Sequence, residues 1–174
     1  MSPLIISHRG KVDLVSPENV LIGIQEAIKL GVDMIEFDVR STKDGRLVCH
    51  HDATVDNRMI SDLTYDVLKN LKKSICKIEE VIDICKDKVG VNLEIKEKGF
   101  EDKIVNLLTS TFSYDKIFVT SFLPSVIRKV KTLDSKITAG LLIGDSINYR
   151  VFYRILKESI FMTEFHYSKA DFIS

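Results

Sequence analysis

Three acidic residues interrupt two otherwise apolar segments of this sequence in the same way. Glu36 and Asp38 stand two positions apart in Met34–Val39, and Glu94 stands near the end of Gly90–Lys96. Successive side chains of a β-strand point to opposite faces, so Glu36 and Asp38 share one face of their strand. Three carboxylates that converge in a partly dry site repel one another unless they share a cation. All-oxygen ligation suits Mg²⁺ or Ca²⁺ better than Zn²⁺, so the pattern predicts a divalent metal site at these three residues.

Two histidines and two cationic residues also follow strand-like segments. His8 comes just after the first apolar run and His51 ends the third, and an imidazole titrates near neutral pH, as a general acid or base must. Arg9 follows His8, and Lys96 shares the alternation of Glu94. A guanidinium can hold two oxygens of a phosphate, and an ammonium adds a point charge. The set predicts acid–base chemistry at a phosphate group, with His8 and His51 as proton carriers and Arg9 and Lys96 as phosphate ligands.

Each of these residues also has an ordinary structural explanation, because carboxylate pairs and single histidines at strand ends are usually solvated or ion-paired. Chemistry is favoured because polar residues interrupt four apolar strand ends, all at one face. His50, by contrast, alternates toward the helix layer, Cys49 falls one layer deeper than His51, and His166 lies in a weakly patterned segment. We assign no chemistry to His50, Cys49 or His166.

Short runs rich in Ile, Val and Leu alternate with segments of helical periodicity, which is typical of repeated βα units around a parallel sheet. The predicted strands are Leu4–Ser7, Met34–Val39, Leu47–His51, Gly90–Lys96, Lys116–Phe122, Ile137–Ile143 and Ala170–Ser174. The predicted helices are Pro17 to Gly31, Tyr65–Leu71, Ile78–Cys85, Phe100–Ser110, Pro124–Leu133 and Tyr149–Lys157. Because no dinucleotide or phosphate-loop fingerprint is present, we predict an α/β fold of the (β/α)₈ TIM-barrel type. The count reaches seven βα units, so the final strand of the barrel is missing.

The composition fits one compact domain across residues 1–174. The chain is 45% hydrophobic with 25 basic and 25 acidic residues, so no excess of positive charge predicts binding to nucleic acid or to an anionic membrane. Its three cysteines lack metal-binding or disulfide spacing, and the N-terminal apolar run is too short for a signal peptide or a membrane span. We therefore predict a cytoplasmic domain without stable membrane insertion that acts on a small molecule.

Six short motifs occur in order along the chain. They are His8-Arg9-Gly10, Pro17-Glu18-Asn19, Glu36-Phe37-Asp38, Thr42-Lys43-Asp44-Gly45, His51-Asp52 and Glu94-Ile95-Lys96. Each is common by itself, but together they resemble the glycerophosphodiester phosphodiesterase family, whose members are TIM barrels of the PLC-like phosphodiesterase superfamily. The resemblance covers the whole chain.

The resemblance implies a Mg²⁺- or Ca²⁺-dependent hydrolase that splits a glycerophosphodiester into glycerol 3-phosphate and an alcohol. It also implies a role for each residue of the predicted site. By this carry-over, Glu36, Asp38 and Glu94 hold the metal, His8 is the base and His51 the acid, and Arg9 and Lys96 contact the phosphate.

The chain departs from the family pattern at two points. The segment after His51-Asp52 lacks the Thr-Thr-x-Gly continuation of many relatives, which leaves the head group open, and the sequence stops at Ser174, where relatives continue to an eighth strand. We expect a truncated or incomplete chain whose open barrel edges favour self-association. Two other functions stay open: a catalytically inactive remnant that binds a ligand or a partner, and a phospholipase-D-like lyase of the same superfamily.

Overall fold

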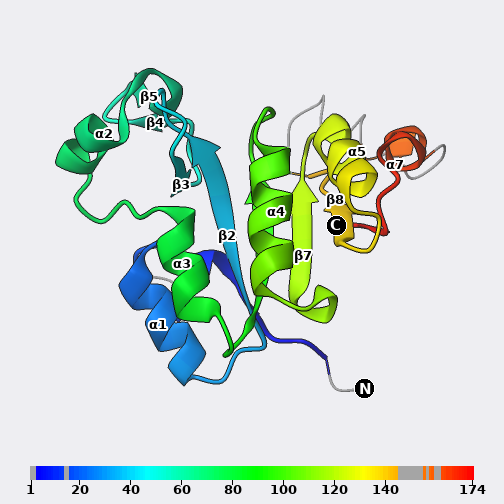
Figure 1. The fold of residues 1–174 in the computed structure, drawn as a ribbon, viewed down its shortest axis with the longest axis horizontal. Helices are drawn as coiled ribbons and strands as arrows, with labels where there is room; N and C mark the ends of the chain where they lie inside the picture. Colours follow the sequence, from blue (N-terminus) through cyan, green and yellow to red (C-terminus); the bar gives the residue numbers. More distant parts are fainter. Residues whose placement is uncertain (1–2, 14–15, 145–154, 156, 159–161) are drawn as a thin grey trace.

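The computed structural model describes residues 3–13, 16–144, 155, 157–158 and 162–174 (Figure 1). Its main sheet has seven strands, and six of them run parallel in the spatial order β1-β2-β6-β7-β8-β9. The strands are β1 (Ile6–Ser7), β2 (Met34–Ser41), β3 (Leu47–Cys49), β4 (Thr54–Val55), β5 (Arg58–Met59), β6 (Gly90–Ile95), β7 (Ile117–Ser121), β8 (Thr138–Leu141) and β9 (Phe172–Ile173). The helices are α1 (Leu21–Lys29), α2 (Tyr65–Leu71), α3 (Ile78–Cys85), α4 (Glu101–Thr111), α5 (Pro124–Leu133) and α7 (Thr163–Ser168), with short 3₁₀ turns η1 (His8–Gly10), η2 (Ile60–Asp62) and η3 (Tyr114–Lys116).

The parallel order with helical connections agrees with the predicted α/β barrel architecture. Helices α1, α3, α4 and α5 contribute side chains to one core that lies against the sheet. The β4–β5 hairpin and α2 lie beyond the carboxyl end of β2, at the upper left of Figure 1. Functional groups of barrel proteins gather at the carboxyl ends of the strands, so this small unit stands on the side where a site is expected. No helix in the described part of the chain is long and apolar enough to cross a membrane.

The third predicted strand is present, but its assignment to a βα unit was wrong. β3 pairs antiparallel with the end of β2, with Val39 opposite Cys49 and Ser41 opposite Leu47. The connection Thr42–Arg46 is a tight turn, and a parallel crossover needs roughly a dozen residues or more. The sheet therefore holds six parallel strands, and His51 lies in the loop that follows β3.

Most helix boundaries follow the apolar periodicity, and one differs for a physical reason. α2, α3 and α5 have the predicted bounds, and α4 is shifted by one residue. α1 begins at Leu21 and not at Pro17, because Asn19 has a left-handed φ of 56° and Val20 is extended. α7 was not predicted, and the helix predicted at Tyr149–Lys157 lies largely outside the described residues.

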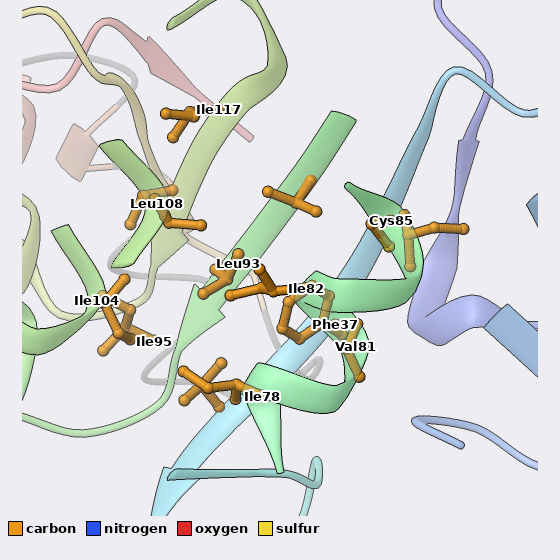
Figure 2. Packing of buried hydrophobic residues seen from close by; sticks show 14 of the residues in the cluster. Phe37, Ile78, Val81, Ile82, Cys85, Leu93, Ile95, Ile104, Leu108 and Ile117 are labelled. Carbon is orange, nitrogen blue, oxygen red and sulfur yellow. The ribbon is translucent and has the colours of Figure 1, made fainter. Parts of the chain in front are cut away.

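The hydrophobic core explains why the polar residues of β2 and β6 face the other way. Phe37, Leu93 and Ile95 are fully buried, and Figure 2 shows them in one layer with side chains of α3 and α4. Burying each such side chain contributes roughly 1.5–3 kcal/mol, which fixes the strand register against slippage. The same alternation sends Glu36, Asp38 and Glu94 to the opposite, inner face of the sheet.

Candidate active site

Three carboxylates from two neighbouring strands meet on the inner face of the sheet. Glu36 and Asp38 come from β2 and Glu94 from β6, and Asp38 and Glu94 are register partners. Each offers an oxygen, and these oxygens lie within 4.8 Å of one another. All three residues are buried, with 0–7% of their surface exposed. Such a group can hold a metal ion, because buried carboxylates need a cation or a proton to balance their charge.

The electrostatics of this group reflect its crowding. Burial, together with the charges of Asp38 and Glu94, raises the pKa of Glu36 to about 8, although the Arg9 backbone N–H donates a 2.7 Å hydrogen bond to its Oε2. Burial also raises the pKa of Glu94. Burial acts to raise the pKa of Asp38 too, but the neighbouring Lys96 and a hydrogen bond from Asn19 outweigh it and hold that pKa below its usual value.

Lys96 extends from the end of β6 into the carboxylate group. Its ammonium pairs with Glu94, and its Nζ lies 2.8 Å from Oδ1 of Asp38. Lys96 therefore contacts two of the three buried carboxylates. Three buried carboxylates that share one ammonium still fit an oxygen-preferring divalent cation such as Mg²⁺ or Ca²⁺.

His8 and Arg9 lie in a loop between β1 and α1. His8 Nε2 is 3.9 Å from Glu36 Oε2, and the His8 side chain is 72% exposed to the cavity and solvent. Arg9 has a left-handed φ of 56°, and its guanidinium lies 2.9 Å from Glu18 and 3.5 Å from Asp38 Oδ2. The loop therefore presents an imidazole and a guanidinium above the carboxylate group.

Two glycines let this loop approach α1 closely. Gly10 has φ +65°, a conformation that costs glycine little, and a Cβ at this position would stand 2.4 Å from Ile24. A Cβ at Gly23, in the first turns of α1, would stand 2.8 Å from the Gly10 carbonyl oxygen. The loop that carries His8 and Arg9 thus rests on the backbone of the helix.

His51 faces the same cavity from the loop after β3. Its Nδ1 lies 2.8 Å from Asp52 Oδ1, and its carbonyl oxygen accepts a 2.9 Å hydrogen bond from Arg40 Nε. Arg40 belongs to β2, so it ties the His51 loop to the strand that carries Glu36 and Asp38.

All seven residues that the sequence nominated are brought together. A cavity of 480 Å³ is lined by His8, Arg9, Glu36, His51, Glu94 and Lys96, and its apolar wall includes Phe118 and Phe172. Asp38 lies beneath this lining and is fully buried. A second cavity of 330 Å³ shares His51, Glu94 and Lys96 and adds Arg40 and Asp52. A carboxylate group that can hold a cation, with two imidazoles and two positive charges around it, can bind a phosphate and move protons at it.

Comparison with known proteins agrees with this chemistry. The sequence model of the Glycerophosphoryl diester phosphodiesterase family matches residues 8–173. The chain belongs to the glycerophosphoryl diester phosphodiesterase family. A glycerophosphodiester phosphodiesterase of Caldanaerobacter subterraneus subsp. tengcongensis is 33% identical to this family member in an alignment of 164 positions that covers 82% of this chain and 67% of that protein. The matched segments span 57–67% of the length of three curated relatives.

Solved structures confirm the barrel fold of this phosphodiesterase family member. The glycerophosphodiester phosphodiesterase of Thermotoga maritima superposes with a TM-score of 0.76 at 24% identity, over 99% of this chain and 74% of that one. A phosphodiesterase of Oleispira antarctica, solved in complex with the product sn-glycerol-3-phosphate, superposes with a TM-score of 0.74 at 21% identity, over 98% of this chain and 74% of that one.

Four residues of the site received no role from the sequence. Glu18, Asn19 and Asp52 were noted only as parts of the Pro17-Glu18-Asn19 and His51-Asp52 motifs, and Arg40 was not singled out. Their contacts depend on loop conformations, which periodicity does not predict.

His50 lies away from the cavity, as alternation predicted. It is buried with its Nε2 3.3 Å from Lys72 Nζ, and burial together with the Lys72 charge lowers its pKa to about 4. His50 is therefore neutral near pH 7 and packs as part of the fold.

Proposed function

We propose that this chain hydrolyses a glycerophosphodiester to glycerol 3-phosphate and an alcohol. The observation that carries the proposal is the convergence of three buried carboxylates, two imidazoles and two cationic side chains at one cavity of 480 Å³. Membership of the phosphodiesterase family supports the reaction class. The glycerol 3-phosphate bound to the Oleispira antarctica relative supports the product.

In this proposal, Glu36, Asp38 and Glu94 hold a divalent cation, Mg²⁺ or Ca²⁺. When bound, such a cation neutralises charge on a phosphate oxygen and lowers the pKa of a coordinated hydroxyl or water. Arg9 and Lys96 bind and orient the phosphate. The Arg9 side chain is held for this task by its ion pair with Glu18.

The two histidines carry the protons. We assign His8 as the general base and His51 as the general acid for the leaving alcohol, in the order that the family resemblance implies. Asp52 binds Nδ1 of His51 and so fixes the ring with Nε2 available for transfer. Proton transfer from a positioned side chain contributes typically about 10²- to 10⁴-fold to a rate.

The experiment is release of glycerol 3-phosphate from glycerophosphocholine and glycerophosphoethanolamine with Mg²⁺, Ca²⁺ or EDTA. We expect cation-dependent release that Glu36→Ala abolishes and that His51→Asn lowers by about 10²- to 10⁴-fold. Asp66→Asn, at an exposed carboxylate on α2, is the matched control and should retain full activity.

Other outcomes would contradict the proposal. A folded, cation-loaded chain that releases no product would favour the inactive barrel remnant. A cyclic glycerophosphate as the only product would favour the lyase, in which a substrate hydroxyl replaces water as the nucleophile.

We further propose that the chain works in the cytoplasm on this small substrate and that it self-associates through the edges of its sheet. Three buried free cysteines, Cys49, Cys76 and Cys85, support a reducing location. Fractionation of cells that produce the full protein, followed by an activity assay of each fraction, tests the location. Activity confined to a membrane or secreted fraction would contradict it.

A further inference from the structure

Asn19 forms a two-point clamp on one of the carboxylates of the site. Its side-chain Nδ2 donates a 2.8 Å hydrogen bond to Asp38 Oδ2, and its Oδ1 accepts a 3.1 Å hydrogen bond from the Asp38 backbone N–H. Both residues are buried, Asn19 with 3% and Asp38 with 0% of its surface exposed. A buried amide that satisfies both its donor and its acceptor on the same residue fixes that residue in one orientation.

The clamp gives the two oxygens of Asp38 different partners. Oδ2 receives the Asn19 hydrogen bond and lies 3.5 Å from Arg9 Nε. Oδ1 is in an ion pair with Lys96, whose Nζ lies 2.8 Å away. One oxygen of Asp38 lies within 4.8 Å of an oxygen of Glu36 and of an oxygen of Glu94. Without the Nδ2 donor, the Asp38 carboxylate could rotate about its Cβ–Cγ bond, and its two oxygens could exchange their partners.

The backbone at Asn19 explains why an asparagine stands there. Its φ is 56°, in the left-handed region that non-glycine residues rarely adopt and that asparagine tolerates best. In this conformation its backbone N–H donates a 2.8 Å hydrogen bond to the Arg9 carbonyl oxygen. Asn19 therefore joins the loop that carries Arg9 to the strand that carries Asp38.

We propose that Asn19 is a positioning residue that orients the Asp38 carboxylate toward the divalent cation. This proposal rests on the proposed function, because it assigns Asp38 to the cation. Asn19 has no contact with the cation or the substrate in this role and acts only through Asp38 and Arg9. Loss of a hydrogen-bond partner of a ligating carboxylate typically weakens metal binding about 10- to 100-fold.

The test is Mn²⁺ binding to Asn19→Gly, measured by electron paramagnetic resonance of free and bound Mn²⁺. Glycine keeps the left-handed backbone without strain and deletes only the amide. The matched control is Asn57→Gly, because Asn57 also has a left-handed φ, of 59°, but is exposed in the β4–β5 turn. We expect an affinity about 10- to 100-fold weaker, with a changed spectrum of bound Mn²⁺, for Asn19→Gly and wild-type values for Asn57→Gly.

A purely structural role would give a different result. Asn19→Gly would then lower the melting temperature of the metal-free protein but leave the Mn²⁺ affinity and spectrum of the folded protein unchanged, and that outcome overturns the proposal. If Asn19→Gly does not fold, Asn19→Asp replaces it, because aspartate keeps the acceptor for the Asp38 N–H and lacks the donor to Oδ2. An unchanged Mn²⁺ spectrum for that variant would equally overturn the proposal. A wild-type chain that binds no Mn²⁺ would instead contradict the metal site of the proposed function.

Discussion

Glu36 keeps its proton to a higher pH than an exposed carboxyl group does, because its burial is reinforced by two acidic neighbours. Its pKa of about 8 means that the cation-free protein holds this residue mainly neutral near pH 7. A metal ligand must be the carboxylate form, so the proton has to leave when a cation binds. Metal affinity is therefore expected to rise with pH until Glu36 ionises by itself.

The predicted rise of metal affinity with pH can be measured as proton release on metal binding. Binding of Mg²⁺ or Ca²⁺ at about pH 7 should release roughly one proton from Glu36, and at about pH 9 the release should approach zero because the free protein is already ionised. Titration calorimetry in buffers with different ionisation enthalpies gives the number of protons released at each pH, and the exposed-site variant Asp66→Asn is the control that should match wild type. The same proton count for the wild-type chain at both pH values would contradict the expectation.

The residues of the site could be nominated from the sequence because alternation and motif order depend only on local spacing. Glu36, Asp38, Glu94 and Lys96 lie on strands, where the side-chain direction follows from the period of two. Asn19 could not be assigned a role in this way. Its amide reaches Asp38 only because the backbone leaves the helical region at φ 56°, which is set by contacts made after the chain has folded.

At the scale of elements, neighbouring side chains of β6 serve different purposes: one face packs in the core, and the other faces the candidate site. Leu93 is fully buried among the helices, and the adjacent Glu94 faces the cavity. Leu93→Ala removes packed methyl groups and leaves a cavity, so it should lower the free energy of unfolding by about 2–5 kcal/mol. Cation affinity of the molecules that remain folded should be unchanged.

Glu94→Gln should give the opposite pattern. It removes a buried charge, and Lys96 keeps its ion pair with Asp38, so the cation-free protein should be at least as stable as wild type. Cation binding should be lost. Urea unfolding and metal titration of both variants measure the two effects. Equal losses of stability and affinity in either variant would show that the two faces of β6 are not independent.

The elements themselves were predictable to different degrees. Strong apolar periodicity located α2, α3 and α5 to the residue, because burial of one face dominates their formation. The direction of β3 was missed, although the short connection Thr42–Arg46 already contained the information that no parallel crossover fits there. The start of α1 could not be predicted, since the tertiary contacts of Asn19 override its helical pattern.

At the scale of the whole molecule, the described sheet has two outer strands that are each paired on one side. β1 pairs with β2, and β9 pairs with β8. Three consecutive apolar residues precede or begin β1, and they are largely exposed: Leu4 at 57%, Ile5 at 60% and Ile6 at 39%. A strand edge with exposed apolar side chains is a template for pairing with another chain.

We therefore expect concentration-dependent self-association of the chain, measured by sedimentation velocity over a hundredfold range of concentration. Ile5→Lys should shift the equilibrium toward the monomer, because a charged side chain disfavours edge pairing. Ile22→Lys, at an exposed apolar position on α1, adds the same charge away from the edge and is the control. A wild-type chain that stays monomeric throughout would contradict this expectation.

The close packing of the β1–α1 loop against α1 also limits how this sequence can change during evolution. A methyl group at position 23 would stand 2.8 Å from the Gly10 carbonyl oxygen, and a backbone atom cannot rotate aside as a side chain can. Position 23 therefore excludes every other amino acid as long as the loop keeps this packing against α1. A lineage that lost this glycine would have to displace the loop, and Arg9 with it, so a helix position with no functional group of its own is constrained by the candidate site.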